Sequence, residues 1–131
     1  MIDHFGFGVS DYERAKAFYI KVLAPLDIEM LMEVPAAMMA SGCAACGFGR
    51  RGKPDFWISA QGKTMPPMHL AFRTETRAQV DAFYRAALEA GATDNGPPGV
   101  RLQYHSNYYG AFVRDLDGHN IEAVCHTPAA T

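Results

Sequence analysis

Three side chains that lie far apart in the sequence have the types that bind a divalent metal ion: His4, His69 and Glu122. Imidazole nitrogen and carboxylate oxygen are common ligands, and two imidazoles with one carboxylate form a facial set that leaves coordination positions open. A metal held in this way could bind two neighbouring oxygens of a small substrate and stabilise a developing enolate or oxyanion as a Lewis acid. The three residues therefore indicate a metal-dependent site.

Each of the three also has an ordinary structural interpretation. A lone histidine in a strand is commonly a hydrogen-bonded core residue, and a lone glutamate usually lies on the solvent face. Glu122, however, stands in the run Asn-Ile-Glu-Ala-Val-Cys, where burying a carboxylate is costly unless it is paired or bound to a metal. An internal repeat further favours the metal site over the structural interpretation.

The repeat has an offset of 65 residues. The segment His4-Phe5-Gly6-Phe7 recurs as His69-Leu70-Ala71-Phe72, and Ala17-Phe18-Tyr19 recurs as Ala82-Phe83-Tyr84 in the same register. The length of 131 residues is about twice the offset, as a duplicated module requires. The two histidines would then occupy equivalent positions.

Each half reads as strand, helix and three strands. Alternation over residues 2–9 predicts a strand with Phe5 and Phe7 on its helix-packed face and His4 on the other face, where Gly6 and Gly8 leave room for a ligand. A capping box from Ser10 to Glu13 and another at Thr76 predict helices to about residues 24 and 90. The other expected strands are 27–34, 43–49, 54–60, 67–73, 100–105, 109–115 and 119–126, with a turn-rich loop at 94–99 and a hairpin at 115–118.

The sequence therefore predicts an α+β fold of two tandem βαβββ modules, with mixed and mostly antiparallel sheets. We expect a single domain over residues 1–131, made of modules at about 1–62 and 66–128.

Composition excludes several classes of protein. The chain is 49% hydrophobic, which suffices for one core, and its net charge of −2 comes without the basic stripe that a nucleic-acid binder needs. No apolar run reaches the roughly 20 residues of a membrane span, and the start resembles no signal peptide. Three cysteines at uneven spacing fit a reduced, cytoplasmic protein, and neither a zinc site nor a thioredoxin-like motif is expected at Cys43 and Cys46.

A cluster between the last strands offers further candidates. His105 is the candidate acid or base, with Tyr104 as a second one, and Tyr108 and Tyr109 would line the mouth of a cavity and bind substrate. The alternative is packing and a surface turn.

Three more residues are candidates for substrate binding. Trp57 would form a flat wall for an apolar or aromatic ligand, or be a core residue. Arg101 would bind an anionic group, or be a solvated strand residue. Asn120 would hydrogen-bond a ligand, or support the hairpin.

The whole pattern resembles the vicinal oxygen chelate superfamily, which includes glyoxalase I, bleomycin-resistance proteins, thiol-transferring fosfomycin-resistance proteins and extradiol dioxygenases. The segments that carry the resemblance are Val9-Ser10-Asp11 through Phe18-Tyr19, Met68–Phe72 and Phe112–Glu122. The resemblance implies sheets curled around a central cavity and a divalent metal (Fe, Mn, Zn or Ni) on His4, His69 and Glu122 from the first, fifth and eighth strands. It also implies a homodimer, with modules paired within one chain or between chains.

One position departs from the family. Glyoxalase I-like members usually have a fourth ligand, Glu or Gln, on the fourth strand, where this chain has Trp57. A three-ligand set is closer to the extradiol dioxygenases and fosfomycin-resistance proteins. We therefore expect a metal-dependent enzyme, of lyase, isomerase or dioxygenase-like type, acting on a small substrate through neighbouring oxygens. The alternative is a non-catalytic protein of the bleomycin-resistance type that sequesters an aromatic or hydrophobic molecule.

Overall fold

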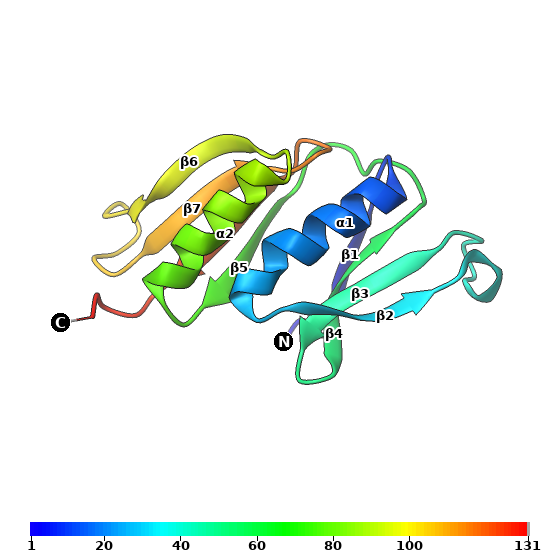
Figure 1. The fold of residues 1–131 in the computed structure, drawn as a ribbon, viewed down its shortest axis with the longest axis horizontal. Helices are drawn as coiled ribbons and strands as arrows, with labels where there is room; N and C mark the ends of the chain where they lie inside the picture. Colours follow the sequence, from blue (N-terminus) through cyan, green and yellow to red (C-terminus); the bar gives the residue numbers. More distant parts are fainter. Residues whose placement is uncertain (131) are drawn as a thin grey trace. The chain divides into compact units, whose positions relative to one another are not determined.

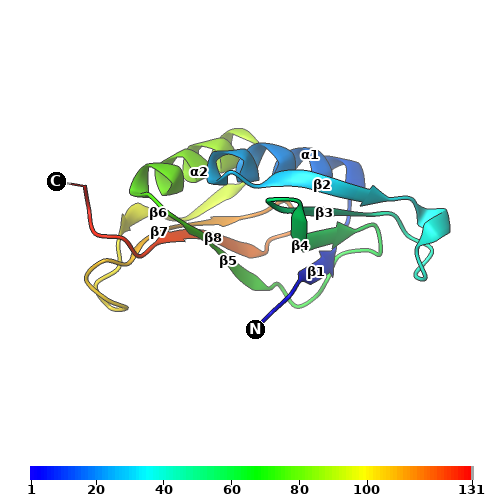
Figure 2. The same cartoon turned by 90° about the horizontal axis from the view of Figure 1, so that it is seen from below.

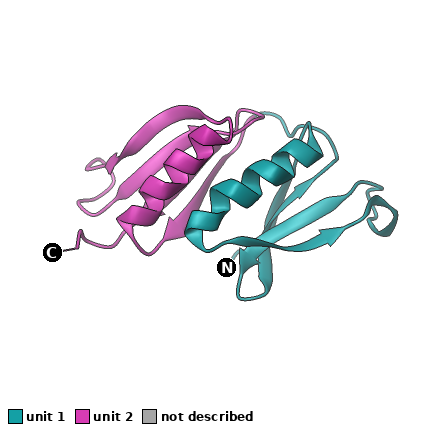
Figure 3. Cartoon of the chain, viewed as in Figure 1, with its two compact units in different colours: residues 1–66 teal, residues 67–131 magenta. Residues whose placement is uncertain are grey.

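The computed structural model describes residues 1–130, which form two compact units with the division between Pro66 and Pro67 (Figure 3). In each unit one helix covers one face of a four-stranded mixed sheet (Figures 1 and 2). The predicted α+β class and the two βαβββ modules are therefore confirmed, whereas the curling of the sheets around a cavity stays a prediction. No helix within residues 1–130 is long and apolar enough to cross a membrane.

The first unit has the sheet order β1-β4-β3-β2, in which β1 pairs parallel with β4 and the other pairs are antiparallel. Its core is largely aromatic. Tyr19 is 1% exposed, and its ring lies 5.1 Å from that of Phe56 and 6.2 Å from that of Phe48. The elements are β1 (Phe5–Gly8), α1 (Tyr12–Leu23), η1 (Ala24–Leu26), β2 (Glu29–Val34), η2 (Ala36–Met38), β3 (Ala45–Arg50) and β4 (Lys53–Ser59).

The start of α1 differs from the expected capping box. The N-cap is Asp11, whose carboxylate accepts a hydrogen bond from the backbone N–H of Arg14 at 3.1 Å. Asp and Ser are comparable N-cap residues, so the sequence Ser-Asp left two registers that differ by one residue. The helix that follows buries Phe18, Tyr19 and Val22 in the core.

The second unit has the equivalent sheet order β5-β8-β7-β6, with β5 parallel to β8 and the other pairs antiparallel. Its helix begins with the predicted capping box between Thr76 and Gln79. The elements are β5 (His69–Thr74), α2 (Arg77–Glu89), β6 (Thr93–Val100), β7 (Tyr109–Arg114) and β8 (Asn120–Cys125).

Strand β6 corrects the expectation of a loop at 94–99 followed by a strand at 100–105. The run Asp-Asn-Gly-Pro-Pro-Gly is itself part of the strand, and residues 101–108 form turns. β6 lies at the edge of its sheet, where proline is tolerated because one side of the strand needs no ladder hydrogen bonds. Two register shifts, between Asp94 and Gly96 and between Gly96 and Gly99, absorb the irregular residues.

Candidate metal and substrate site

Glu122 is buried in the middle of β8, on the sheet face away from α2. Its neighbours Ile121 and Ala123 are fully buried, and in the β7–β8 ladder they share a sheet face with Tyr109. The hydroxyl of Tyr109 reaches Asp81 on α2, so this is the face that the helix covers. Because strand side chains alternate between faces, Glu122 lies on the other face. Its side chain is 2% exposed, so the carboxylate needs partners to offset its desolvation.

His69 is one of those partners, and its geometry indicates a cation. Its Nε2 lies 3.1 Å from Oε2 of Glu122, while its Nδ1 lies 3.1 Å from the backbone oxygen of Asn120. A carbonyl only accepts, so Nδ1 carries the hydrogen and, in a neutral ring, Nε2 carries a lone pair. A lone pair facing a carboxylate oxygen is repulsive unless a proton or a metal lies at that point. Two neighbouring ligands with bonds of about 2.1 Å at right angles are separated by about 3 Å, so the pair fits a metal ion.

His4 presents the same nitrogen. It directly precedes β1, and its Nδ1 lies 2.8 Å from Oδ2 of Asp3. The hydrogen bond from His4, followed by the charge of Lys53, holds the pKa of Asp3 below its usual value. Metal-binding histidines commonly donate one ring N–H to a carboxylate or a carbonyl. Both histidines therefore have Nδ1 engaged and Nε2 available.

The ligand candidates are divided between the two units. His69 and Glu122 lie together in the second unit, whereas His4 belongs to the first. Within residues 1–130, no three His, Cys, Asp or Glu side chains are gathered so that they could hold a metal. The donor chemistry thus fits a metal ion at two ligands of one unit, and the third ligand remains a prediction.

The registers place Trp57 where the second unit has Glu122. Gly6 pairs with Trp57 in the first unit, and Ala71 pairs with Glu122 in the second, at the offset of the sequence repeat. Asp55 is the extra residue of a bulge in β4, because Phe48 pairs with Phe56 and Gly49 with Pro54. The first unit therefore has an indole where a fourth carboxylate or amide ligand would stand.

The glycines of β1 correct the expectation that they leave room for a ligand. A Cβ on Gly8 would lie 2.1 Å from the backbone oxygen of Gly62, and one on Gly6 would lie 3.0 Å from Cβ of Trp57. The glycines instead allow close approach of the chain itself. A hollow of about 310 Å³ does lie beside them, lined by Gly6, Phe7, Gly8, Trp57, Ile58, Ser59, Gln61 and Thr64.

Tyr108 is the second partner of Glu122, because its hydroxyl donates a hydrogen bond to Oε1. Burial, followed by this hydrogen bond, raises the pKa of Tyr108 far above its usual value, so the phenol keeps its proton. The ring of Tyr104 lies 4.7 Å from that of Tyr108, and the ring of His105 lies 5.5 Å away. Of these three candidates, Tyr108 contacts the Glu122 carboxylate directly, and Tyr104 and His105 pack against the ring of Tyr108.

Arg101 lies against Phe112, the residue of β7 that pairs with Glu122. Its guanidinium is 5.4 Å from the ring of Phe112, which pairs with Glu122 in the β7–β8 ladder and stacks at 6.2 Å on the ring of His69. The guanidinium also donates to the backbone oxygen of Pro97 at 2.7 Å. Phe112 is not among the candidate site residues predicted from the sequence. The signal was present, because a hairpin at 115–118 places Phe112 opposite Glu122.

Two candidates are placed elsewhere. Tyr109 donates its hydroxyl to Asp81 of α2 at 2.7 Å, so it lies on the helix-covered face, opposite to Glu122. The side-chain oxygen of Asn120 accepts from Asn95 at 3.1 Å, while its backbone oxygen orients His69. Asn120 therefore supports the site through its main chain.

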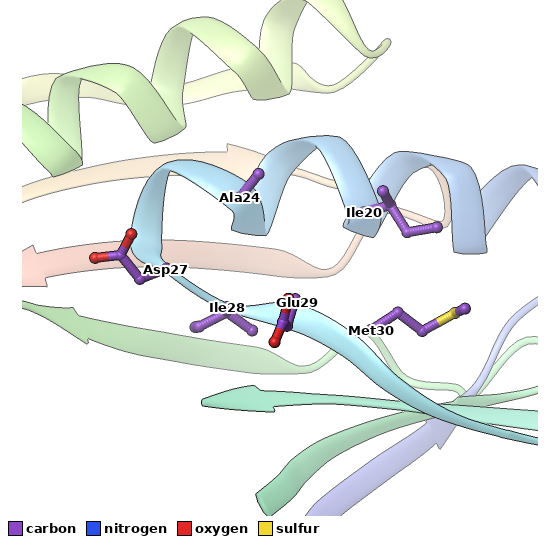
Figure 4. Close-up of a pocket in the computed structure, with 6 residues that line it drawn as sticks. All are labelled: Ile20, Ala24, Asp27, Ile28, Glu29 and Met30. Atoms are coloured by element: carbon purple, nitrogen blue, oxygen red, sulfur yellow. The ribbon is translucent and has the colours of Figure 1, made fainter. Parts of the chain in front are cut away.

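A larger hollow, of about 590 Å³, lies between the end of α1 and the start of β2. Figure 4 shows the side chains that line it, and none of them is a candidate from the sequence: Ile20, Ala24, Asp27, Ile28, Glu29 and Met30. It lies in the first unit, and the buried carboxylate lies in the second.

Comparison with known proteins agrees with this architecture. Residues 1–123 match the Glyoxalase/Bleomycin resistance protein/Dioxygenase superfamily, and the chain belongs to this superfamily. It is 31% identical to the metallothiol transferase FosB of Shouchella clausii (strain KSM-K16), over 92% of this chain and 77% of that protein.

Solved structures show the same fold. A glyoxalase/bleomycin resistance protein from Albidiferax ferrireducens T118 has a TM-score of 0.73 and 28% identity, over 96% of this chain and 98% of that one. Glyoxalase I from Zea mays has a TM-score of 0.70 at 17% identity, over 95% of this chain and 45% of that one, which is a likeness of fold alone.

Proposed function

We propose that this protein is a metal-dependent enzyme whose divalent ion is held by His4, His69 and Glu122. The observation that carries the proposal is the contact at 3.1 Å between Nε2 of His69 and a buried carboxylate oxygen, with Nδ1 committed to a backbone carbonyl. A bound ion would act as a Lewis acid toward two neighbouring oxygens of a small substrate.

The surrounding side chains would bind and orient that substrate. Arg101 lies on Phe112 beside the ligand pair and offers a guanidinium to an anionic group. His105, with Tyr104 next to Tyr108, is the candidate for moving a proton. Similarity to a metallothiol transferase supports transfer of a thiol to an electrophile as the first reaction to test.

Metal titration tests the proposal. We expect the untagged wild-type protein to bind about one divalent ion per chain, and His4→Ala to weaken the affinity at least about 10-fold because one of three ligands is lost. Chelator-treated wild-type protein should melt at a lower temperature than the loaded form, since a ligand of the native state stabilises it. Failure to bind Mn, Fe, Zn or Ni after anaerobic reconstitution would contradict the proposal.

A mixing experiment identifies the chain that supplies His4. If the site is built between two copies in a homodimer, mixed His4→Ala and Glu122→Gln chains regain one intact site per dimer. If it is built within one chain, the mixture binds no more metal than the separate variants.

A second candidate function is non-catalytic binding of an aromatic molecule in the first unit. The half-buried indole of Trp57 lies over Gly47, where a Cβ would come within 2.8 Å of the ring, and it borders the hollow of about 310 Å³. Such a surface is suited to stacking.

Trp57 is the single tryptophan of the chain, so its fluorescence reports directly on this function. For metal-free protein, we expect planar aromatic probes to quench the emission, and Trp57→Ala to weaken their binding about 10-fold as measured by equilibrium dialysis. Trp57→Phe, which keeps a flat ring, should lose less. Equal binding by all three proteins would refute the stacking function and leave the metal site untouched.

A further inference from the structure

The two oxygens of the Glu122 carboxylate have different partners. Oε1 accepts the hydrogen bond from the hydroxyl of Tyr108, while Oε2 faces Nε2 of His69 at 3.1 Å. The carboxylate therefore offers one oxygen toward the imidazole and keeps the other on a phenol.

Gly110 makes the contact with the phenol sterically feasible. A Cβ at this position would lie 3.2 Å from Oε1 of Glu122 and 3.2 Å from Cε1 of Tyr108. Both distances are tighter than ordinary side-chain contacts, so a larger residue would displace the phenol or the carboxylate by a few tenths of an ångström.

The position of Tyr108 is held by its own segment, residues 101–108. Its backbone oxygen accepts from the N–H of Arg101 at 2.8 Å, and its N–H donates to the oxygen of His105 at 3.2 Å. Nε2 of His105 lies 2.9 Å from Nδ1 of His126, whose ring packs 5.3 Å from that of Tyr108. The backbone of Tyr108 is thus held within the segment, and its ring packs on His126, the residue that follows β8.

The segment itself is not a second metal site. Nδ1 of His105 accepts from the N–H of Asn107 at 3.1 Å, so in a neutral ring the hydrogen is on Nε2 and points at His126. A metal at Nε2 would need that hydrogen to move to Nδ1, where it would face another N–H. In this arrangement the contact between His105 and His126 supports the ring of Tyr108.

We propose that Tyr108 is a positioning residue that fixes Glu122 as a one-oxygen ligand, with Oε2 directed to the metal beside Nε2 of His69. This inference rests on the proposed function. A phenol that occupies Oε1 prevents the carboxylate from turning to bind the metal through both oxygens. When no metal is bound, the same hydrogen bond stabilises the buried charge of Glu122. Outer partners of this kind commonly change metal affinity by about 10- to 100-fold.

The test compares two neighbouring tyrosines. Tyr108→Phe removes the hydroxyl on Glu122, and Tyr109→Phe removes a hydroxyl on another carboxylate, Asp81, on the opposite face of the sheet. Mn(II) affinity is measured by competition with a chelating dye, and the visible absorption of Co(II) reports the ligand geometry. We expect Tyr108→Phe to weaken Mn(II) binding about 10- to 100-fold and to change the Co(II) spectrum, while Tyr109→Phe matches the wild type.

Identical Mn(II) affinity and Co(II) spectra for Tyr108→Phe and the wild type would overturn the inference, while the metal site would stand. A wild type that binds no metal would instead overturn the proposed function. If Tyr108→Phe does not fold, Gly110→Ala tests the same contact from the other side. It should weaken Mn(II) binding in the same direction, and wild-type affinity in a folded Gly110→Ala protein would refute the inference.

Discussion

Glu122→Gln is expected to abolish metal binding while leaving the metal-free protein as stable as the wild type, or more stable. Glutamine has the shape of glutamate but no charge, and an amide oxygen is a poorer ligand for a divalent ion. The loss of affinity should exceed about 100-fold, the upper end of what outer partners contribute. The amide oxygen can still accept from Tyr108, and removal of a buried charge lowers the cost of desolvation.

Two measurements separate these effects. Metal content after dialysis, measured by elemental analysis, reports the ligand role, and urea unfolding of chelator-treated protein reports the stability. Glu89→Gln, on the exposed end of α2, is the matched control and should behave as wild type in both. A Glu122→Gln protein that keeps stoichiometric metal would show that the carboxylate is structural. The metal site would then need a different donor.

Tyr19→Ala is expected to cost about 3–5 kcal/mol of the free energy of unfolding, as for other large aromatic residues removed from a core. Its ring contacts four other aromatic rings in the first unit, those of Phe7, Phe18, Phe48 and Phe56. Because the side chain of Tyr19 is only 1% exposed, its truncation to alanine leaves a cavity in the core.

The repeat supplies its control. Tyr84 occupies the equivalent position in α2, but it is only half-buried and donates its hydroxyl to Asp94 at 2.9 Å in an exposed pair. Tyr84→Ala should therefore cost about 1 kcal/mol, the contribution of a solvent-exposed hydrogen bond and modest packing. Denaturant unfolding of both variants checks the difference. Equal losses would mean that the two modules have equivalent cores, contrary to the structure.

Residue type and periodicity determined much of the fold. The offset of 65 residues predicted the two modules, and the registers of β1–β4 and β5–β8 reproduce it. Alternation in Asn-Ile-Glu-Ala-Val-Cys predicted that Glu122 faces away from Ile121 and Ala123, and all three are buried. These features follow from local sequence because side chains in a strand alternate whatever the strand packs against.

The sequence was less informative where two local choices have nearly equal energy. Ser10 and Asp11 are similar N-caps, and the structure caps the helix with Asp11. The turn-forming residues of 94–99 form part of an edge strand. β7 supplies a hydrogen-bonding partner on one side, and an edge strand needs no ladder hydrogen bonds on the other.

The site itself depended most on tertiary structure. In the sequence, Tyr108 and Tyr109 are equal candidates, but the pairing of β7 with β8 sends one hydroxyl to Glu122 and the other to Asp81. The sequence likewise does not show which imidazole nitrogen of His69 can bind a metal. The structure decides it, because Nδ1 donates to the carbonyl of Asn120 on the parallel neighbouring strand. The sequence by itself supplied the ligand types and their faces. The partners that orient them come from other strands, so only the assembled sheet could decide them.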